Sequence, residues 1–137
     1  MPYDRADKSV TERRRISSGG PWEAAAGYSR AVVVGDACFV SGTTDAGPDG
    51  RARHPGDIAA QAQATLETIQ RALRDGGFGV EHVVRTRMFV TDIARSREVL
   101  EVHRRWFGEI RPAASMVQVG TLIDPSLLIE IEVEARR

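Results

Sequence analysis

The sequence lacks the features that would place it outside the cytosol. Its 137 residues include one cysteine, Cys38, so no intrachain disulfide can form, and such scarcity is typical of a reducing compartment. No apolar run approaches the roughly 20 residues that a membrane-spanning helix needs. The N-terminal stretch also lacks the apolar segment of a signal peptide. These absences predict a cytoplasmic protein with no membrane partner.

The sequence also lacks an excess of charge of either sign. Lys and Arg number 19, Asp and Glu number 19, and the formal net charge is zero. Because nucleic-acid binders usually carry a basic surplus, we expect no nucleic-acid partner. The arginine run at 13–15 is interpreted as part of a solvated arm or a short edge strand. A neutral protein repels its own copies only weakly, which favours self-association.

Motifs of common catalytic machinery are missing as well. The chain has no Gly-rich phosphate loop, no dinucleotide fingerprint and no nucleophile elbow. The histidines His54, His82 and His103 are not at metal-ligating spacing, and one cysteine excludes a thiolate-rich site. We therefore expect no metal and no cofactor. Cys38 is interpreted as a core residue, and His103 as a half-buried helix residue.

Hydrophobic periodicity predicts an α+β domain. Two helices would cover one face of a mixed sheet, giving two layers. Residues 1–17 are predicted to be a polar arm and residues 18–137 a single domain. The predicted elements are a hairpin of strands at 31–34 and 37–41, a loop at 45–56, a helix at 58–75 capped by Asp57, a strand at 83–90, a helix at 93–107, and strands at 115–119 and 127–135.

The final strand contains the most informative pattern. Residues 129–134 alternate Ile, Ile and Val with Glu130, Glu132 and Glu134, so one face is apolar and the other acidic. A row of carboxylates needs water, cations or a special pocket. If the acidic face were buried between subunits, desolvation would raise the pKa of Glu130, which could then act as an acid or base. The alternative is a solvated or ion-paired strand residue.

Two further positions have alternative interpretations. Gly42 directly follows a predicted strand, where glycine often marks a close approach of the backbone to another group. A simple strand end would also explain it. Tyr28, taken alone, is a loop tyrosine.

Several short segments together resemble the RidA/YjgF family of reactive-intermediate deaminases. Each is short, but their order and spacing are specific, and the resemblance covers residues from about 18 to 135. The segments are Gly27-Tyr28-Ser29, Phe39-Val40-Ser41-Gly42, Gln61, Val83-Val84-Arg85-Thr86, Phe89-Val90-Thr91-Asp92, Arg111-Pro112-Ala113-Ala114-Ser115 and Ile129-Glu130-Ile131-Glu132.

The resemblance implies a chorismate-mutase-like fold and a homotrimer. Three sheets would line a barrel-like interior, with the helices outside and small-molecule sites in clefts between subunits. Active members hydrolyse enamines and imines, such as 2-aminoacrylate, to 2-oxo acids and ammonia without a metal or organic cofactor.

The resemblance also implies a set of site residues. Glu130 would orient water, and Tyr28, Gly42 and the adjacent Thr43 would line the ligand site. Met116 takes a position that is often small or cysteine in the family. Leu100 falls near the place of a helix asparagine.

Ala114 marks the main departure from the family pattern, since it replaces the arginine that grips the substrate carboxylate. A planar guanidinium binds a carboxylate through two parallel hydrogen bonds, and alanine cannot. Either Arg87 or His103 is a candidate replacement, although an ion pair with the glutamate row also explains Arg87. We therefore predict an enamine or imine hydrolase with a substrate other than 2-aminoacrylate. The alternative is a non-catalytic trimer that binds a small ligand or regulates a partner.

Overall fold

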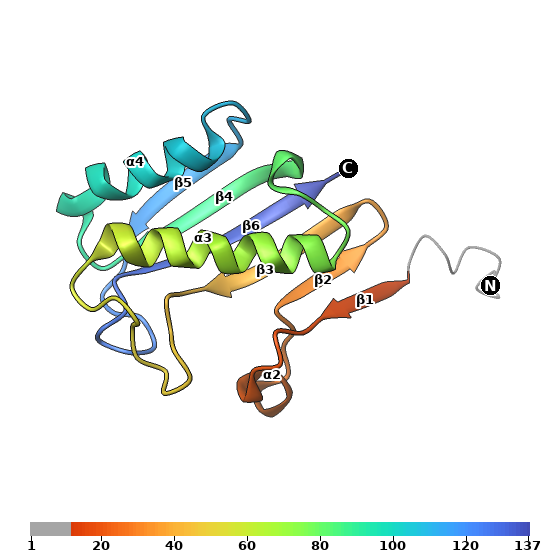
Figure 1. The fold of residues 1–137 in the computed structure, drawn as a ribbon, viewed down its shortest axis with the longest axis horizontal. Helices are drawn as coiled ribbons and strands as arrows, with labels where there is room; N and C mark the ends of the chain where they lie inside the picture. The colour runs from red at the N-terminus through yellow and green to blue at the C-terminus, as the bar shows by residue number, and fades with distance from the viewer. Residues whose placement is uncertain (1–11) are drawn as a thin grey trace, which may run out of the picture.

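The computed structural model describes residues 12–137, which form one six-stranded sheet with helices packed on it (Figure 1). The sheet order is β1-β2-β3-β6-β4-β5, and all neighbours are antiparallel except β4 and β5, which are parallel. The strands are β1 (Arg13–Ile16), β2 (Ala31–Val34), β3 (Ala37–Thr43), β4 (Val83–Val90), β5 (Ala113–Gln118) and β6 (Ile129–Arg136). The helices are α2 (Pro21–Ala26), α3 (Ile58–Asp75), α4 (Ser96–Phe107) and the 3-10 turns η2 (Val80–His82) and η3 (Ile93–Arg95).

The two long helices lie on the same face of the sheet (Figure 1). Helix α3 begins as predicted, because the side chain of Asp57 accepts a hydrogen bond of 3.0 Å from the amide of Ala60. It ends before Gly76 and Gly77, and Gly77 adopts φ +83°, a conformation that glycine tolerates best. The predicted α+β class, with two helices on one face of a mixed sheet, is confirmed.

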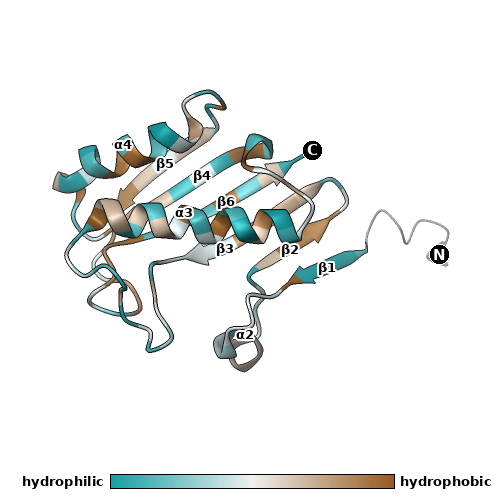
Figure 2. Ribbon diagram, in the orientation of Figure 1, coloured by the Kyte–Doolittle hydropathy of each residue, from teal (hydrophilic) through white to brown (hydrophobic). Residues whose placement is uncertain are grey.

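The core lies between this helical layer and one face of the sheet. On β6, Ile129, Ile131 and Val133 are buried and point toward the helices, while the intervening glutamates point to the uncovered face. The hydropathy of the elements is drawn in Figure 2, where β1 is largely hydrophilic. Cys38 is fully buried in this core as predicted, and burial raises the pKa of its thiol.

The N-terminal segment differs in part from the prediction. Arg13–Ile16 pairs with β2 as the edge strand, so the sheet includes residues that we assigned to the arm. This outcome matches the edge-strand alternative, and three arginines suit an edge because charge discourages unwanted strand pairing. Residues 1–11 of the predicted arm lie outside the described residues. The short helix α2 was not predicted, although Pro21 occupies a favoured position at its start.

No helix within residues 12–137 combines the length and the apolar character needed to cross a bilayer.

Candidate functional site

Glu130 lies on the uncovered face of the sheet, near the start of β6. It is half-buried and pairs across the sheet with Phe89 of β4. Burial raises the pKa of the Glu130 carboxyl, the negative charge of Glu132 raises it further, and the positive charge of Arg30 lowers it in part. A carboxyl with a raised pKa is better suited to proton transfer near neutral pH than an ordinary one.

Gly42 lies directly against the Glu130 side chain. The register of β3 against β6 shifts between Val40 and Thr43, so the strand bulges at the two residues between them. A Cβ atom at Gly42 would stand 2.7 Å from Oε2 of Glu130, which is closer than real Cβ contacts allow. The expectation of a close backbone approach at Gly42 is therefore confirmed, and the group that approaches is Glu130.

Tyr28 and Arg30 complete this cluster from the segment that leads into β2. The Arg30 guanidinium donates a hydrogen bond of 2.5 Å to the carbonyl of Gly42, and its carbon lies 5.9 Å from the centre of the Tyr28 ring. Tyr28 follows the end of α2, where Gly27 adopts φ +76°. The sequence interpretation missed Arg30, although it directly follows the Gly27-Tyr28-Ser29 segment that carries part of the resemblance.

Arg87 forms ion pairs with the glutamate row, which was the alternative interpretation of this residue. Its Nη1 lies 3.0 Å from Glu134 and 3.3 Å from Glu132 on the uncovered face. The hydrogen bond that Arg87 donates to Glu134 and the charges of both carboxylates raise the pKa of Arg87. The guanidinium is thus directed along the glutamate row and away from Glu130, so a ligand-binding role for Arg87 has no support from its geometry.

Three other predicted residues lie on the opposite, helix-covered face. Thr43 is 2% exposed, and its hydroxyl donates to the carbonyl of Ser41. Ala114 and Met116 on β5 are in register with Thr86 and Met88 of β4, which point into the core. Within one chain, therefore, these residues do not share a pocket with Glu130.

His103 is a titratable group on the sheet face that carries Ala114. Its Nε2 lies 2.8 Å from the hydroxyl of the fully buried Thr86, which is the strand neighbour of Ala114. Burial lowers the pKa of the His103 imidazole, so it is mainly neutral at neutral pH. Leu100 lies one turn earlier on α4 and is half exposed. A neutral imidazole could donate a hydrogen bond there but would not replace the charge of an arginine.

Gln61 fixes the segment that delivers Glu130. Its buried amide donates to the carbonyls of His54 at 3.1 Å and Ser126 at 3.0 Å, and its oxygen accepts from the amide of Leu128 at 2.8 Å. Leu128 stands two residues before Glu130. A helix side chain thereby joins the 45–56 loop to the start of β6 and sets where that strand begins.

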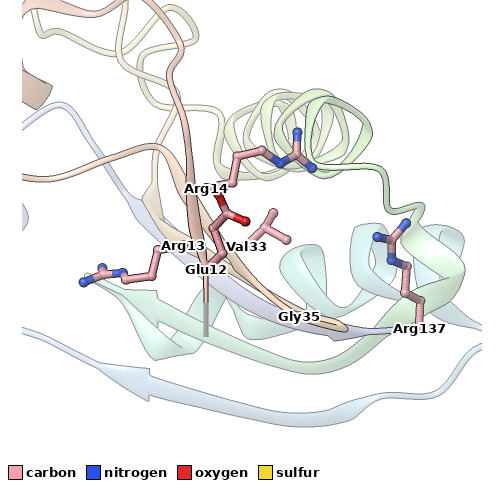
Figure 3. Close-up of a pocket in the computed structure, with 6 residues that line it drawn as sticks. All are labelled: Glu12, Arg13, Arg14, Val33, Gly35 and Arg137. Carbon is pink, nitrogen blue, oxygen red and sulfur yellow. The ribbon is translucent and has the colours of Figure 1, made fainter. Parts of the chain in front are cut away.

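A basic hollow of about 370 Å³ lies elsewhere, beside β1 and the C-terminus (Figure 3). Two of its arginines are used by the fold. Arg14 donates to the carbonyl of Gly76 at 2.8 Å, and Arg137 donates to that of Gly77 at 2.9 Å while lying over the Phe78 ring. These contacts satisfy carbonyls at the end of α3, so the hollow is better explained as helix capping than as an anion site.

The cluster of Glu130, Arg30, Tyr28 and the backbone of Gly42 is therefore the candidate site on the uncovered sheet face. Comparison with known proteins gives the family. Residues 20–137 match the family model described as Endoribonuclease L-PSP. The chain belongs to this family, which is also known as the RidA/YjgF family.

Proteins similar in sequence or structure match most of the chain. A Mycobacterium tuberculosis protein, Rv2704 of the YjgF/YER057c/UK114 family, is 49% identical, with a TM-score of 0.84 over 92% of this chain and 100% of that one. The 3-aminoacrylate deaminase RutC of Acinetobacter baylyi is 36% identical over 76% of this chain and 82% of its own length. The structure of E. coli TdcF with bound serine is 29% identical, with a TM-score of 0.73 over 90% of this chain and 94% of that one.

Proposed function

We propose that this protein hydrolyses an enamine or imine of a small metabolite, with Glu130 as the working carboxyl. The observation that carries the proposal is the half-buried Glu130 carboxyl with its raised pKa, placed against the Gly42 backbone. The deaminase name of the RutC relative and the bound serine of TdcF support a small nitrogen-containing ligand.

The chemistry needs one base and one water molecule. Glu130 accepts a proton as water adds to the carbon of the C=N bond of the protonated imine, and the resulting tetrahedral carbon bears both a hydroxyl and an amine. Glu130 then returns this proton to the amine nitrogen, the C–N bond breaks, and the C=O bond forms as the hydroxyl proton leaves with the departing ammonia as ammonium. Tyr28 lines the site with an amphipathic ring, and the Gly42 backbone offers polar groups at close range.

The proposal includes a homotrimer in which the uncovered sheet faces point inward. Phe39 and Val117 lie on that face and are 42% and 46% exposed, so covering the face with other subunits would remove apolar surface from water. Ala114 and Glu130 lie on opposite faces of one sheet, so they could line a common cleft only if different subunits supplied them. Light scattering of the purified protein tests this, and a clean monomer would contradict a site built between subunits.

Ammonia release tests the activity itself. Imines are generated in place by an amino-acid oxidase from several amino acids, and ammonia formation is followed with and without the protein. We expect faster release with the native protein and loss of the excess with Glu130→Gln. Glu134→Gln is the matched control, because Glu134 lies on the same strand and face but pairs with Arg87. If ammonia forms no faster with the protein than without it for every amino acid tested, the activity is refuted.

A second candidate is a binding protein without turnover, and Ala114 is the observation that favours it. Without an arginine at this position, a carboxylate ligand loses a bidentate contact, and each charge-assisted hydrogen bond is worth about 1.5–3 kcal/mol. Thermal stabilisation by small amino or oxo acids, with no ammonia released from any imine, would support this alternative. No feature of the site favours RNA cleavage, and the charged residues of the chain balance to zero.

A further inference from the structure

Arg30 holds the bulge at Gly42 from two sides. Its backbone carbonyl accepts a hydrogen bond of 3.0 Å from the amide of Ser41, and its guanidinium donates to the carbonyl of Gly42. One residue thereby fixes both residues of the bulge, including the glycine against which Glu130 packs. A movement of Arg30 would therefore change the surface that sets the position of the Glu130 carboxyl.

Arg30 is also the cation that acts on Glu130. The groups beside Glu130 come from its own strand and from the two strands next to it: Glu132 of β6, Gly42 of β3 and Phe89 of β4. Glu132 adds negative charge, although part of it is engaged by Arg87, and the other two are uncharged. Within residues 12–137, Arg30 is the group whose charge favours the ionised carboxyl of Glu130.

The hydrogen-bonding capacity of Arg30 is not exhausted by the fold. A guanidinium has five N–H donors. Its Nε is buried without a partner among the described residues. Buried donors are almost always paired, and an unpaired one costs free energy. A residue kept for stability alone would be expected to satisfy this donor, so the placement of Arg30 points to the site that it borders.

We propose that Arg30 is a positioning residue of the Glu130 site. Its hydrogen bond fixes the Gly42 bulge, and its positive charge opposes the negative charge of the glutamate row to which Glu130 belongs. This inference rests on Glu130 being the working carboxyl of the proposed function. It goes beyond that function because it assigns the ionisation of Glu130 at working pH to one named cation.

The sign of the effect follows from the charges. The positive charge of Arg30 lowers the pKa of Glu130, whereas burial and Glu132 raise it. When the cation is removed, the two raising causes act without opposition, and Glu130 is protonated at a higher pH. A base that is protonated near neutral pH cannot accept a proton from water, so catalysis would require a higher pH.

Carbon-13 NMR of the side-chain carboxyls tests the proposal directly in the full chain. The Glu130 signal is assigned from its absence in Glu130→Gln, and its titration midpoint is measured in the native protein, Arg30→Met and Arg30→Lys. We expect a midpoint at higher pH in Arg30→Met and one closer to the native midpoint in Arg30→Lys, which retains the charge. Arg85→Met is the control, because Arg85 lies on the same face in register with Glu134, and its charge is not among those that act on Glu130.

Amide hydrogen exchange at Gly42 provides the second measurement. It should be faster in both Arg30 variants, because lysine cannot reproduce the planar hydrogen-bonding geometry of the guanidinium. An unchanged midpoint in Arg30→Met, or an equal shift in Arg85→Met, would overturn the proposal. If Arg30→Met does not fold, unchanged exchange at Gly42 in Arg30→Lys would overturn it instead.

The titration also separates this inference from the proposed function. A shifted Glu130 midpoint without ammonia release in any protein would leave the positioning role intact and refute the hydrolase. Ammonia release that depends on Glu130 but has the same pH profile in Arg30→Met would support the hydrolase and refute the positioning role of Arg30.

Discussion

The carboxylate of Glu130 and the backbone of Gly42 are in such close contact that no side chain fits between them. A Cβ at residue 42 would lie 2.7 Å from Oε2 and 2.9 Å from Cδ of Glu130. The glycine and the carboxyl come from neighbouring antiparallel strands that are distant in sequence. Their contact gives the candidate site its shape and leads to the first prediction.

Gly42→Ala should displace Glu130 while leaving the fold intact. The clashing atoms belong to the end of a flexible side chain, and glycine within a strand is itself roughly 0.5–1 kcal/mol less stable than alanine. We therefore expect the free energy of unfolding to change by less than about 1 kcal/mol. Glu130-dependent hydrolysis should fall by about 100-fold, as expected for a catalytic group that is misplaced by about 1 Å. Urea unfolding and ammonia release measure the two effects.

Gly120→Ala is the matched control, because nothing lies within 4 Å of a Cβ there. Equal loss of activity in both variants would mean that Gly42 has no specific relation to the site.

Gln61→Leu should destabilise the protein strongly, although leucine has a similar size. The change leaves the carbonyls of His54 and Ser126 and the amide of Leu128 without their present partner. With about 1–3 kcal/mol for each of these three groups, we expect a loss of at least about 3 kcal/mol. Chemical unfolding measures this loss. Gln70→Leu on the same helix is the control, and a similar loss there would remove the specific role of Gln61.

His103 should make the protein less stable in mild acid. Burial lowers its pKa in the folded state below the ordinary value of 6.5, so the unfolded chain binds the proton first on acidification. The free energy of unfolding therefore falls as the pH drops through 6.5 toward the lowered pKa, and the His103 contribution is complete above 6.5. His103→Gln should flatten this dependence below pH 6.5.

Unfolding titrations at several pH values measure this slope, with His82→Gln as a comparison for the general effect of losing a histidine. Equal slopes in the native protein and His103→Gln would contradict the assignment to His103.

Ala114→Arg should restore an arginine contact to the substrate carboxylate if the trimer places Ala114 beside the acidic sheet face of a neighbouring subunit. Ala114 is exposed on β5, so the fold should accept the longer side chain. A new charge-assisted hydrogen bond of about 1.5–3 kcal/mol corresponds to a tenfold to hundredfold gain on 2-aminoacrylate. Ammonia release from 2-aminoacrylate generated in place measures the gain.

Ala113→Arg is the natural comparison, since Ala113 is equally exposed but in register with Arg85 on the uncovered face. An assembled but inert Ala114→Arg variant would show that the other departures from the family pattern matter at least as much.

The sequence by itself determined the elements and their class. The alternation at 129–134 identified the buried and acidic faces of β6, and the Asp57 cap with the apolar stripe after it identified α3. These signals are local, because strand and helix periods are set by neighbouring residues along the chain. The short helix α2 was missed because six residues carry little periodic signal.

Only the tertiary structure decided which residues meet. Sequence spacing could not show that Arg30 reaches the carbonyl of Gly42, that Arg87 turns toward Glu134, or that Thr43 faces the core. Each depends on the strand register and on the bulge in β3, which reverses the alternation of side chains within two residues. Strand pairing between distant segments fixes those features, and no local pattern contains them.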